Sequence, residues 1–300
     1  MQTKDFLLAL MVAIIWGANY SVIGIGLKHL DPFLLTAFRF SLCAFPLCFF
    51  IKKPNISIYI IATYGITFGV GLWGIVNLAI FNGVSPGIAS LLLQFSAFFT
   101  ILISSFIFKE RIKFIQHIGM IIAILGLIFA LCFRGEKSSL LGGILIIIAS
   151  LSWSICNIIV KKYKPLEMMS FIIWSCLFSS PPLFIITYLT KGKVPFVNIT
   201  NSLNPQTIFS ICFQAYITTL FGYWIWNMLM KKYEATIIAP ISLLIPIFGI
   251  LSANIVFNEE IGYYKITSTF LILLGIYTLV FGEKTKDKIL HMRISKKFKL

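Results

Sequence analysis

Long apolar stretches alternate with short polar segments along the whole chain. Ten of these stretches hold about 20 residues each, enough to cross roughly 30 Å of hydrocarbon as a helix. They cover residues 6–27, 33–51, 58–81, 86–108, 114–133, 140–160, 169–189, 207–229, 235–257 and 264–281. No soluble domain fits between them, and the longest connection is 190–206. The pattern predicts an all-α polytopic membrane protein with ten transmembrane helices.

Local signals refine the first two stretches. The first follows Lys4 and Asp5 and contains no small-residue cleavage site, so we interpret it as a retained helix rather than a signal peptide. Before the second, Asp31 is followed by Pro32. This order is typical of a helix start, with the aspartate as N-cap and proline at the first helical position.

Composition and charge support the membrane prediction. The chain is 59% hydrophobic and 12% charged, which is too apolar for an ordinary soluble domain. Of its 25 lysines and arginines, 18 lie in segments on the side of the N-terminus, six on the other side, and Arg39 lies within a stretch. By the positive-inside rule, both termini are expected in the cytoplasm. The basic tail, 284–300, is expected to contact anionic lipid headgroups, and the distribution argues against a nucleic-acid partner.

Several kinds of chemistry have no signature here. The six cysteines lie inside apolar stretches without C-x-x-C spacing, so neither disulfides nor a metal site are expected. There is no G-x-x-x-x-G-K-[ST] loop, no H-E-x-x-H pair and no Ser-His-Asp arrangement. We therefore expect no cofactor, no ATP-driven transport by this chain alone, and no enzymatic activity.

The two halves of the chain repeat each other. Shifting the sequence by 149 residues aligns 80–133 with 229–282 and pairs Glu110 with Glu259. We divide the chain into a first repeat (1–135) and a second (136–283). Five spans per repeat is an odd number, so the second repeat must be inverted in the membrane. Inverted repeats are typical of secondary transporters, whose halves expose one central site to each side in turn.

Polar side chains inside the apolar stretches are the candidates for that site. An amide facing lipid would lack hydrogen-bond partners, so these residues should face the interior. Two W-x-x-N or W-x-x-x-N stretches occur at matched places, a further asparagine pair lies in the third and eighth spans, and a glutamine lies in the fourth. The candidate substrate-binding residues of this kind are Trp16, Asn19, Asn77, Gln94, Trp153, Asn157 and Asn227.

Arg39 is the one permanent charge well inside a span. Placing arginine there costs roughly 2.5–3.5 kcal/mol on insertion scales, so something must compensate for it. It could be the counter-charge for a substrate carboxylate, or it could bond helix-end carbonyls or reach toward an interface. The sequence leaves both interpretations open.

Other residues suggest shape and movement. Four interior aromatic residues could fill the core or form an aromatic cage over a substrate ammonium: Trp16, Trp73, Trp153 and Trp224. Pro240 and Pro246 free backbone carbonyls in the ninth span, where they could provide a hinge.

The sequence resembles the EamA family of the drug/metabolite transporter superfamily over nearly its whole length. The resemblance is carried by W-G-A-N-Y-S-V-I, R-F-S-L-C-A-F-P, L-L-L-Q-F-S-A-F-F-T and W-S-I-C-N-I. It implies ten helices in two inverted five-helix repeats and a bacterial cytoplasmic membrane location. It is strongest toward the family's exporters of amino-acid metabolites such as cysteine and O-acetylserine.

The leading hypothesis is therefore a secondary transporter that exports a small-molecule substrate, an amino-acid metabolite, by alternating access. Import of S-adenosylmethionine or another metabolite is an alternative within the same class. A non-transporting membrane subunit or a lipid-modifying enzyme is an alternative from another class. The sequence does not determine the oligomeric state.

Overall fold

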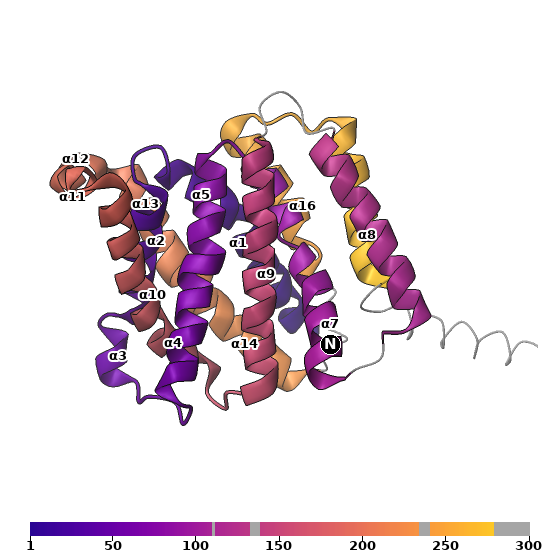
Figure 1. The fold of residues 1–300 in the computed structure, drawn as a ribbon, viewed down its shortest axis with the longest axis horizontal. Coiled ribbons are helices and arrows are strands. Elements are labelled where there is room, and N and C mark those ends of the chain that lie inside the picture. The colour runs from indigo at the N-terminus through magenta and orange to yellow at the C-terminus, as the bar shows by residue number, and fades with distance from the viewer. Residues whose placement is uncertain (110–111, 133–138, 234–240, 279–300) are drawn as a thin grey trace, which may run out of the picture.

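The computed structural model describes residues 1–109, 112–132, 139–233 and 241–278, and every regular element in these ranges is a helix (Figure 1). The elements are α1 (Thr3–Gly26), α2 (Pro32–Ala44), α3 (Leu47–Phe50), α4 (Ile58–Ile66), η1 (Thr67–Gly74), α5 (Ile75–Phe81), α6 (Pro86–Leu92), α7 (Phe95–Phe108), α8 (Phe114–Cys132), α9 (Leu140–Tyr163), α10 (Met168–Lys191), α11 (Val194–Val197), α12 (Ile199–Ser202), α13 (Pro205–Cys212), η2 (Phe213–Phe221), α14 (Gly222–Lys232) and α16 (Ile245–Phe257). A further helix covers 263–278.

Membrane-length helices dominate this architecture. Within the described ranges, seven helical stretches are long and apolar enough to cross a membrane. They are Thr3–Gly26, Pro32–Phe50, Ile58–Phe81, Pro86–Phe108, Leu140–Tyr163, Met168–Lys191 and Pro205–Met230. Phe114–Ala130 and Ile245–Phe257 are shorter apolar helices at two further predicted spans. The molecule is a multi-pass membrane protein, although the described residues do not establish ten complete spans.

One connection matches the sequence prediction and another departs from it. At the start of α2, Asp31 Oδ1 accepts hydrogen bonds from the backbone N–H groups of Phe33 (2.9 Å) and Leu34 (3.2 Å), which confirms the predicted cap. The predicted 190–206 loop, in contrast, contains α11 and α12, which Figure 1 shows at the end of the molecule away from α3 and the N-terminus.

Several helices are interrupted at corresponding places in the two repeats. The segments η1 and η2 are π-helical. When the second repeat is shifted back by 149 residues, η2 (213–221) falls on 64–72 and so overlaps η1 (67–74). A turn at 93–94 separates α6 from α7, and a turn at 243–244 precedes α16, 150 residues later. Because such interruptions change which backbone groups are bonded, they commonly accompany functional sites in membrane helices.

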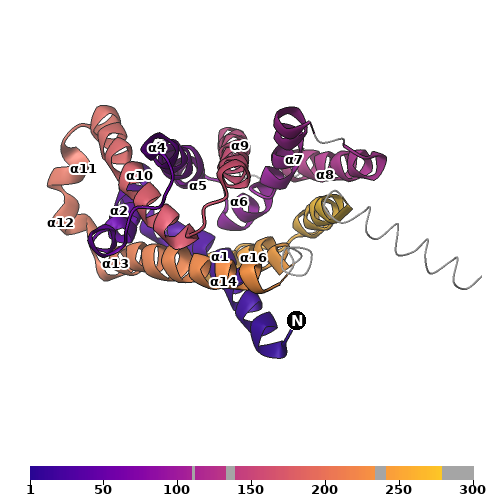
Figure 2. The same cartoon turned by 90° about the horizontal axis from the view of Figure 1, so that it is seen from below.

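The helices pack in two facing rows (Figure 2). One row contains α4, α5, α9 and α7, and the other contains α14, α1 and α16. The first helix of each repeat packs against the other repeat, on the second half of its fourth predicted span. Thus α1 packs on α16, and α9 packs on α7. At one end of the rows, α2 packs against α10. Helices of the two halves are thus packed against each other rather than kept in separate bundles.

Close contact between α1 and α16 depends on a glycine. A Cβ atom at Gly17 would lie 2.6 Å from Phe248 Cβ and 2.7 Å from the Ile245 carbonyl oxygen. Small residues allow helices in a membrane to approach this closely, and packing rather than the hydrophobic effect holds such helices together.

We therefore expect Gly17→Ala to destabilise the protein by about 1–3 kcal/mol, the usual cost of overpacking. Thermal unfolding of the detergent-purified protein measures this. The control is Ile14→Phe on the same helix, since Ile14 is 43% exposed on the outer face. Equal midpoints for the two variants would contradict the close-packing account.

Candidate functional site

A cavity of about 650 Å³ lies between the two rows of helices and is lined by residues of both repeats. Six of the residues that the sequence nominated are in its lining. They are Trp16, Arg39, Gln94, Trp153, Asn157 and Asn227. They come from the first, second, fourth, sixth and eighth predicted spans, so residues up to 211 positions apart in sequence meet here.

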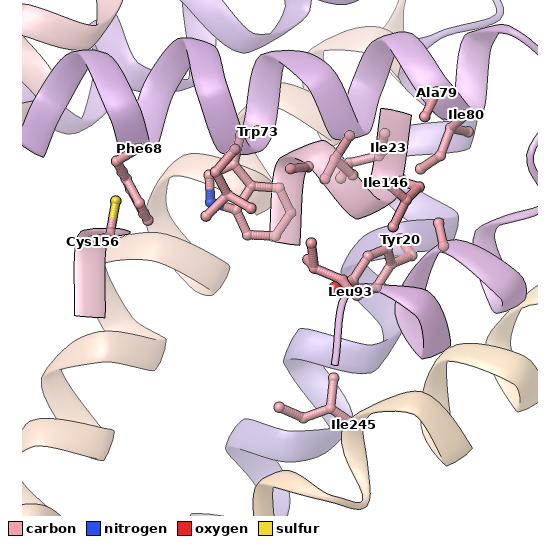
Figure 3. Close-up of a cluster of buried hydrophobic side chains, with 14 of the residues drawn as sticks. Tyr20, Ile23, Phe68, Trp73, Ala79, Ile80, Leu93, Ile146, Cys156 and Ile245 are labelled. Atoms are coloured by element: carbon pink, nitrogen blue, oxygen red, sulfur yellow. The ribbon is translucent and has the colours of Figure 1, made fainter. Parts of the chain in front are cut away.

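The cavity opens toward one side of the protein. Its lining reaches Gln116 at the start of α8, Met168 at the start of α10 and the 38%-exposed Met230 near the end of α14. All three positions lie on the side where α1 begins. Toward the other side, buried side chains close it, and Figure 3 shows some of them: Tyr20, Ile23, Ile80, Leu93 and Ile146.

Arg39 lies fully buried in the wall of the cavity. Its Nε and Nη2 donate hydrogen bonds to Thr219 Oγ1 at 3.1 and 3.0 Å. Its guanidinium carbon lies 4.2 Å from the centre of the Trp73 ring and 5.3 Å from that of Phe40. No carboxylate among the described residues forms an ion pair with it. Two hydrogen bonds and two rings thus fix the group while its charge stays unneutralised.

The hydroxyl that holds Arg39 is itself part of the interrupted helix. Thr219 lies in η2, and its Oγ1 donates to the Gln214 carbonyl at 2.8 Å, five residues earlier. The π-helical geometry therefore sets the position of the arginine's partner.

Several nitrogen donors in the cavity wall lack a partner. Within the described part of the chain, these are Arg39 Nη1, Trp73 Nε1, Gln94 Nε2 and Asn227 Nδ2. Unpaired buried donors cost roughly 1–3 kcal/mol each, and native proteins keep few of them. Their concentration in one cavity points to a binding role.

The paired asparagines occupy different surroundings. Asn157 lines the cavity and donates to Thr100 Oγ1 at 3.2 Å. Asn19 lies behind the lining, where its Oδ1 accepts from Thr218 Oγ1 at 3.0 Å. Asn77 is also behind it and donates to Thr36 Oγ1 at 2.8 Å. All three face the interior, but only Asn157 faces the cavity itself.

An aromatic wall completes the site, and it differs from the predicted one. The Trp16 ring lies 5.2 Å from both Tyr223 and Trp226, and its Nε1 donates to the Thr218 carbonyl at 3.0 Å. Trp224, by contrast, is 53% exposed and does not line the cavity. Two helical positions correspond to about 200° of rotation, so Trp224 and Trp226 point to nearly opposite faces. Sequence reasoning also passed over Tyr20 and Tyr64, which line the cavity.

The interrupted helices surround the site. Trp73 belongs to η1, Thr218 to η2, and Gln94 to the turn between α6 and α7. Pro246 is buried at the second position of α16, next to the lining residue Ile245. The other predicted hinge residue, Pro240, lies outside the described residues.

An ion pair joins the two repeats on the open side. Lys232 Nζ lies 2.8 Å from Asp5 Oδ2, and the Tyr233 hydroxyl donates to the same oxygen. The hydrogen bond with Asp5 raises the pKa of Lys232 above its ordinary value. Because Lys232 is half exposed, water screens this contact, and it serves as a weak tie between α1 and α14.

Comparison with known proteins agrees with this architecture. Residues 3–132 and 140–281 each match the EamA-like transporter family. A protein of Escherichia coli (strain K12) named "Probable amino-acid metabolite efflux pump" is 35% identical, with 96% of this chain and 99% of the relative covered. A Salmonella typhimurium protein of the same name is also 35% identical, with 95% and 98% covered.

More distant proteins extend the comparison. An uncharacterized transporter of Bacillus subtilis is 24% identical, with 93% of this chain and 98% of the relative covered. One solved crystal structure superposes with a TM-score of 0.61 at 15% identity, covering 93% of this chain and 98% of the other. This last likeness concerns the fold alone.

The contact between Arg39 and Thr219 can be tested directly. Thr219→Val removes the acceptor of both bonds and is expected to cost about 1–3 kcal/mol, because it leaves charged donors buried without a partner. Thermal unfolding is the measurement, with Thr63→Val as the matched control. The Thr63 hydroxyl is exposed and bonds only the Tyr59 carbonyl of its own helix. If Thr219→Val is no less stable than Thr63→Val, Thr219 does not stabilise the arginine.

Proposed function

Since the chain belongs to the EamA-like transporter family, we propose that it is a secondary transporter that exports small amino-acid metabolites, such as cysteine and O-acetylserine, across the bacterial cytoplasmic membrane. The names and near-complete coverage of the two 35%-identical relatives support this substrate class. The observation that carries the proposal is the buried Arg39, which has no carboxylate partner among the described residues of a cavity large enough for a metabolite.

The cavity offers complementary chemistry to both ends of an amino acid. Arg39 supplies a positive charge for the carboxylate, with Gln94 Nε2 and Asn227 Nδ2 as further donors. Amide oxygens of the same side chains and the ring faces around Trp16 would receive the ammonium group. Asn19 would act from behind the wall by positioning the lining residue Thr218, whereas Asn77 would hold α2 in place through Thr36.

The mechanism we propose is alternating access between the two repeats. The cavity opens on the N-terminal side, which the lysine and arginine distribution assigns to the cytoplasm. This is the state in which an exporter would load its substrate. The matched interruptions at η1, η2 and the two turns are where the helices would bend as the opening changes sides.

Counter-flow into proteoliposomes tests the proposal. Vesicles loaded with unlabelled cysteine or O-acetylserine should accumulate the labelled compound, and labelled S-adenosylmethionine should not accumulate. Asn157→Ala, which removes an amide from the wall, should slow initial uptake about tenfold, the equivalent of roughly 1.4 kcal/mol. The matched control is Asn82→Ala, since Asn82 is exposed and bonds only Leu78 O.

Two results would contradict the proposal. One is the absence of any amino-acid accumulation above protein-free vesicles when the protein is correctly folded. The other is accumulation of S-adenosylmethionine in preference to both amino acids.

A further inference from the structure

The unsatisfied groups of the cavity wall share one hydrogen-bonding character. Among the described residues, the lining atoms that are both fully buried and without a partner are all N–H donors, from Arg39, Trp73, Gln94 and Asn227. The two amide oxygens in the same unpaired state belong to Asn77 and Gln214, which do not line the cavity. A ligand that satisfies these buried atoms must therefore bring acceptors.

Charge leads to the same conclusion. Arg39 is the one permanently charged side chain in the described lining, and no Asp or Glu accompanies it. A ligand with a single negative charge would make the closed site neutral. A zwitterion would pair its carboxylate but would also bring an ammonium group into a site without a carboxylate. A cationic ligand would add a second positive charge near a buried one.

The cavity also has room for more than a small free amino acid. Its volume of about 650 Å³ is that of a site for ligands considerably larger than cysteine. The Trp16 ring, 5.2 Å from each of the Tyr223 and Trp226 rings, presents with them a flat apolar surface beside the donors. An acyl group on the amino nitrogen would use this surface, and its carbonyl oxygen would accept a further hydrogen bond.

We propose that the cavity selects by net negative charge, so that amino acids acylated on nitrogen bind at least as well as the free amino acids, whereas their cationic esters are rejected. This inference rests on the proposed transport of amino-acid metabolites and narrows its substrate class to carboxylates whose amine need not be charged. Arg39, Gln94 and Asn227 are the specificity-determining residues.

Binding can be measured separately from transport. Trp16, Trp73, Trp153 and Trp226 line the cavity, so tryptophan fluorescence of the full-length purified protein reports its occupancy. The probes are S-methylcysteine, N-acetyl-S-methylcysteine and S-methylcysteine methyl ester, which at pH 6 are predominantly a zwitterion, a monoanion and a cation. We expect the monoanion to bind at least as tightly as the zwitterion and at least tenfold more tightly than the ester.

Charge reversal in the wall tests the cause. Gln94→Glu places a carboxylate among the donors at nearly unchanged volume and should weaken monoanion binding at least tenfold while strengthening that of the ester. Asn227→Asp makes the same change in the second repeat and serves if the first variant does not fold. The control is Asn82→Asp, an exposed site outside the cavity, which should leave the order of the three probes unchanged.

Three outcomes would overturn the inference. If the zwitterion binds but the monoanion is more than tenfold weaker, the charge rule is wrong while amino-acid transport stands. If Gln94→Glu and Asn227→Asp both fold and both keep the wild-type order of affinities for the three probes, the charge of Arg39 does not set that order. If none of the three probes binds, the inference and the proposed function fail together.

Discussion

The buried guanidinium of Arg39 is the constraint on which the rest of the site depends. A permanent charge inside a membrane protein requires local compensation, and here it comes from one hydroxyl and two rings rather than from a carboxylate. Thr219 accepts both hydrogen bonds, and Trp73 lies 4.2 Å from the guanidinium carbon. Neither contact neutralises the charge. The protein therefore keeps a positive potential in the wall of its central cavity, which favours an anionic group in the ligand.

Two of the three supports of Arg39 come from π-helical segments. Thr219 belongs to η2 and Trp73 to η1, which occupy overlapping positions in the two repeats. A movement of either segment would shift the arginine's partner and so change the cavity's affinity for an anion. Binding and conformational change would then be coupled through the same side chains, as alternating access requires, because a ligand shifts the population of states only through differential contacts.

The fold was largely predictable from sequence, since its signals are strong and repeated. Apolar length predicted the membrane helices, and Asp31 and Pro32 predicted the start of α2. The interior position of Asn19, Asn77 and Asn157 followed from the cost of an amide in lipid. The interruptions at η1 and η2 carry no comparable signal, because both segments are as apolar as their neighbours and contain no proline. The short helices α11 and α12 were also missed.

The site was predictable in its polar members and less so in its aromatic ones. Arg39, Gln94, Asn157 and Asn227 stand out because polar residues are rare in these spans. All six tryptophans lie within the predicted spans, so their presence alone did not identify the lining ones. Choosing correctly between Trp224 and Trp226 required the rotation of the helix after η2, which a π-helical segment changes. Whether an amide lines the cavity or supports it from behind, as Asn157 and Asn19 respectively do, depends on packing between distant spans.

The most direct measurement is the distance between Arg39 and the carboxylate of a bound amino acid. Solid-state NMR can measure it by dipolar recoupling between the carboxyl carbon of ¹³C-labelled O-acetylserine and ¹⁵N-labelled arginine side chains in membranes. We expect a carbon-to-nitrogen distance of about 4 Å, as in a charge-assisted hydrogen bond, and its loss in Arg39→Gln. Saturated binding without this dipolar coupling would show that Arg39 serves packing alone and would contradict the account.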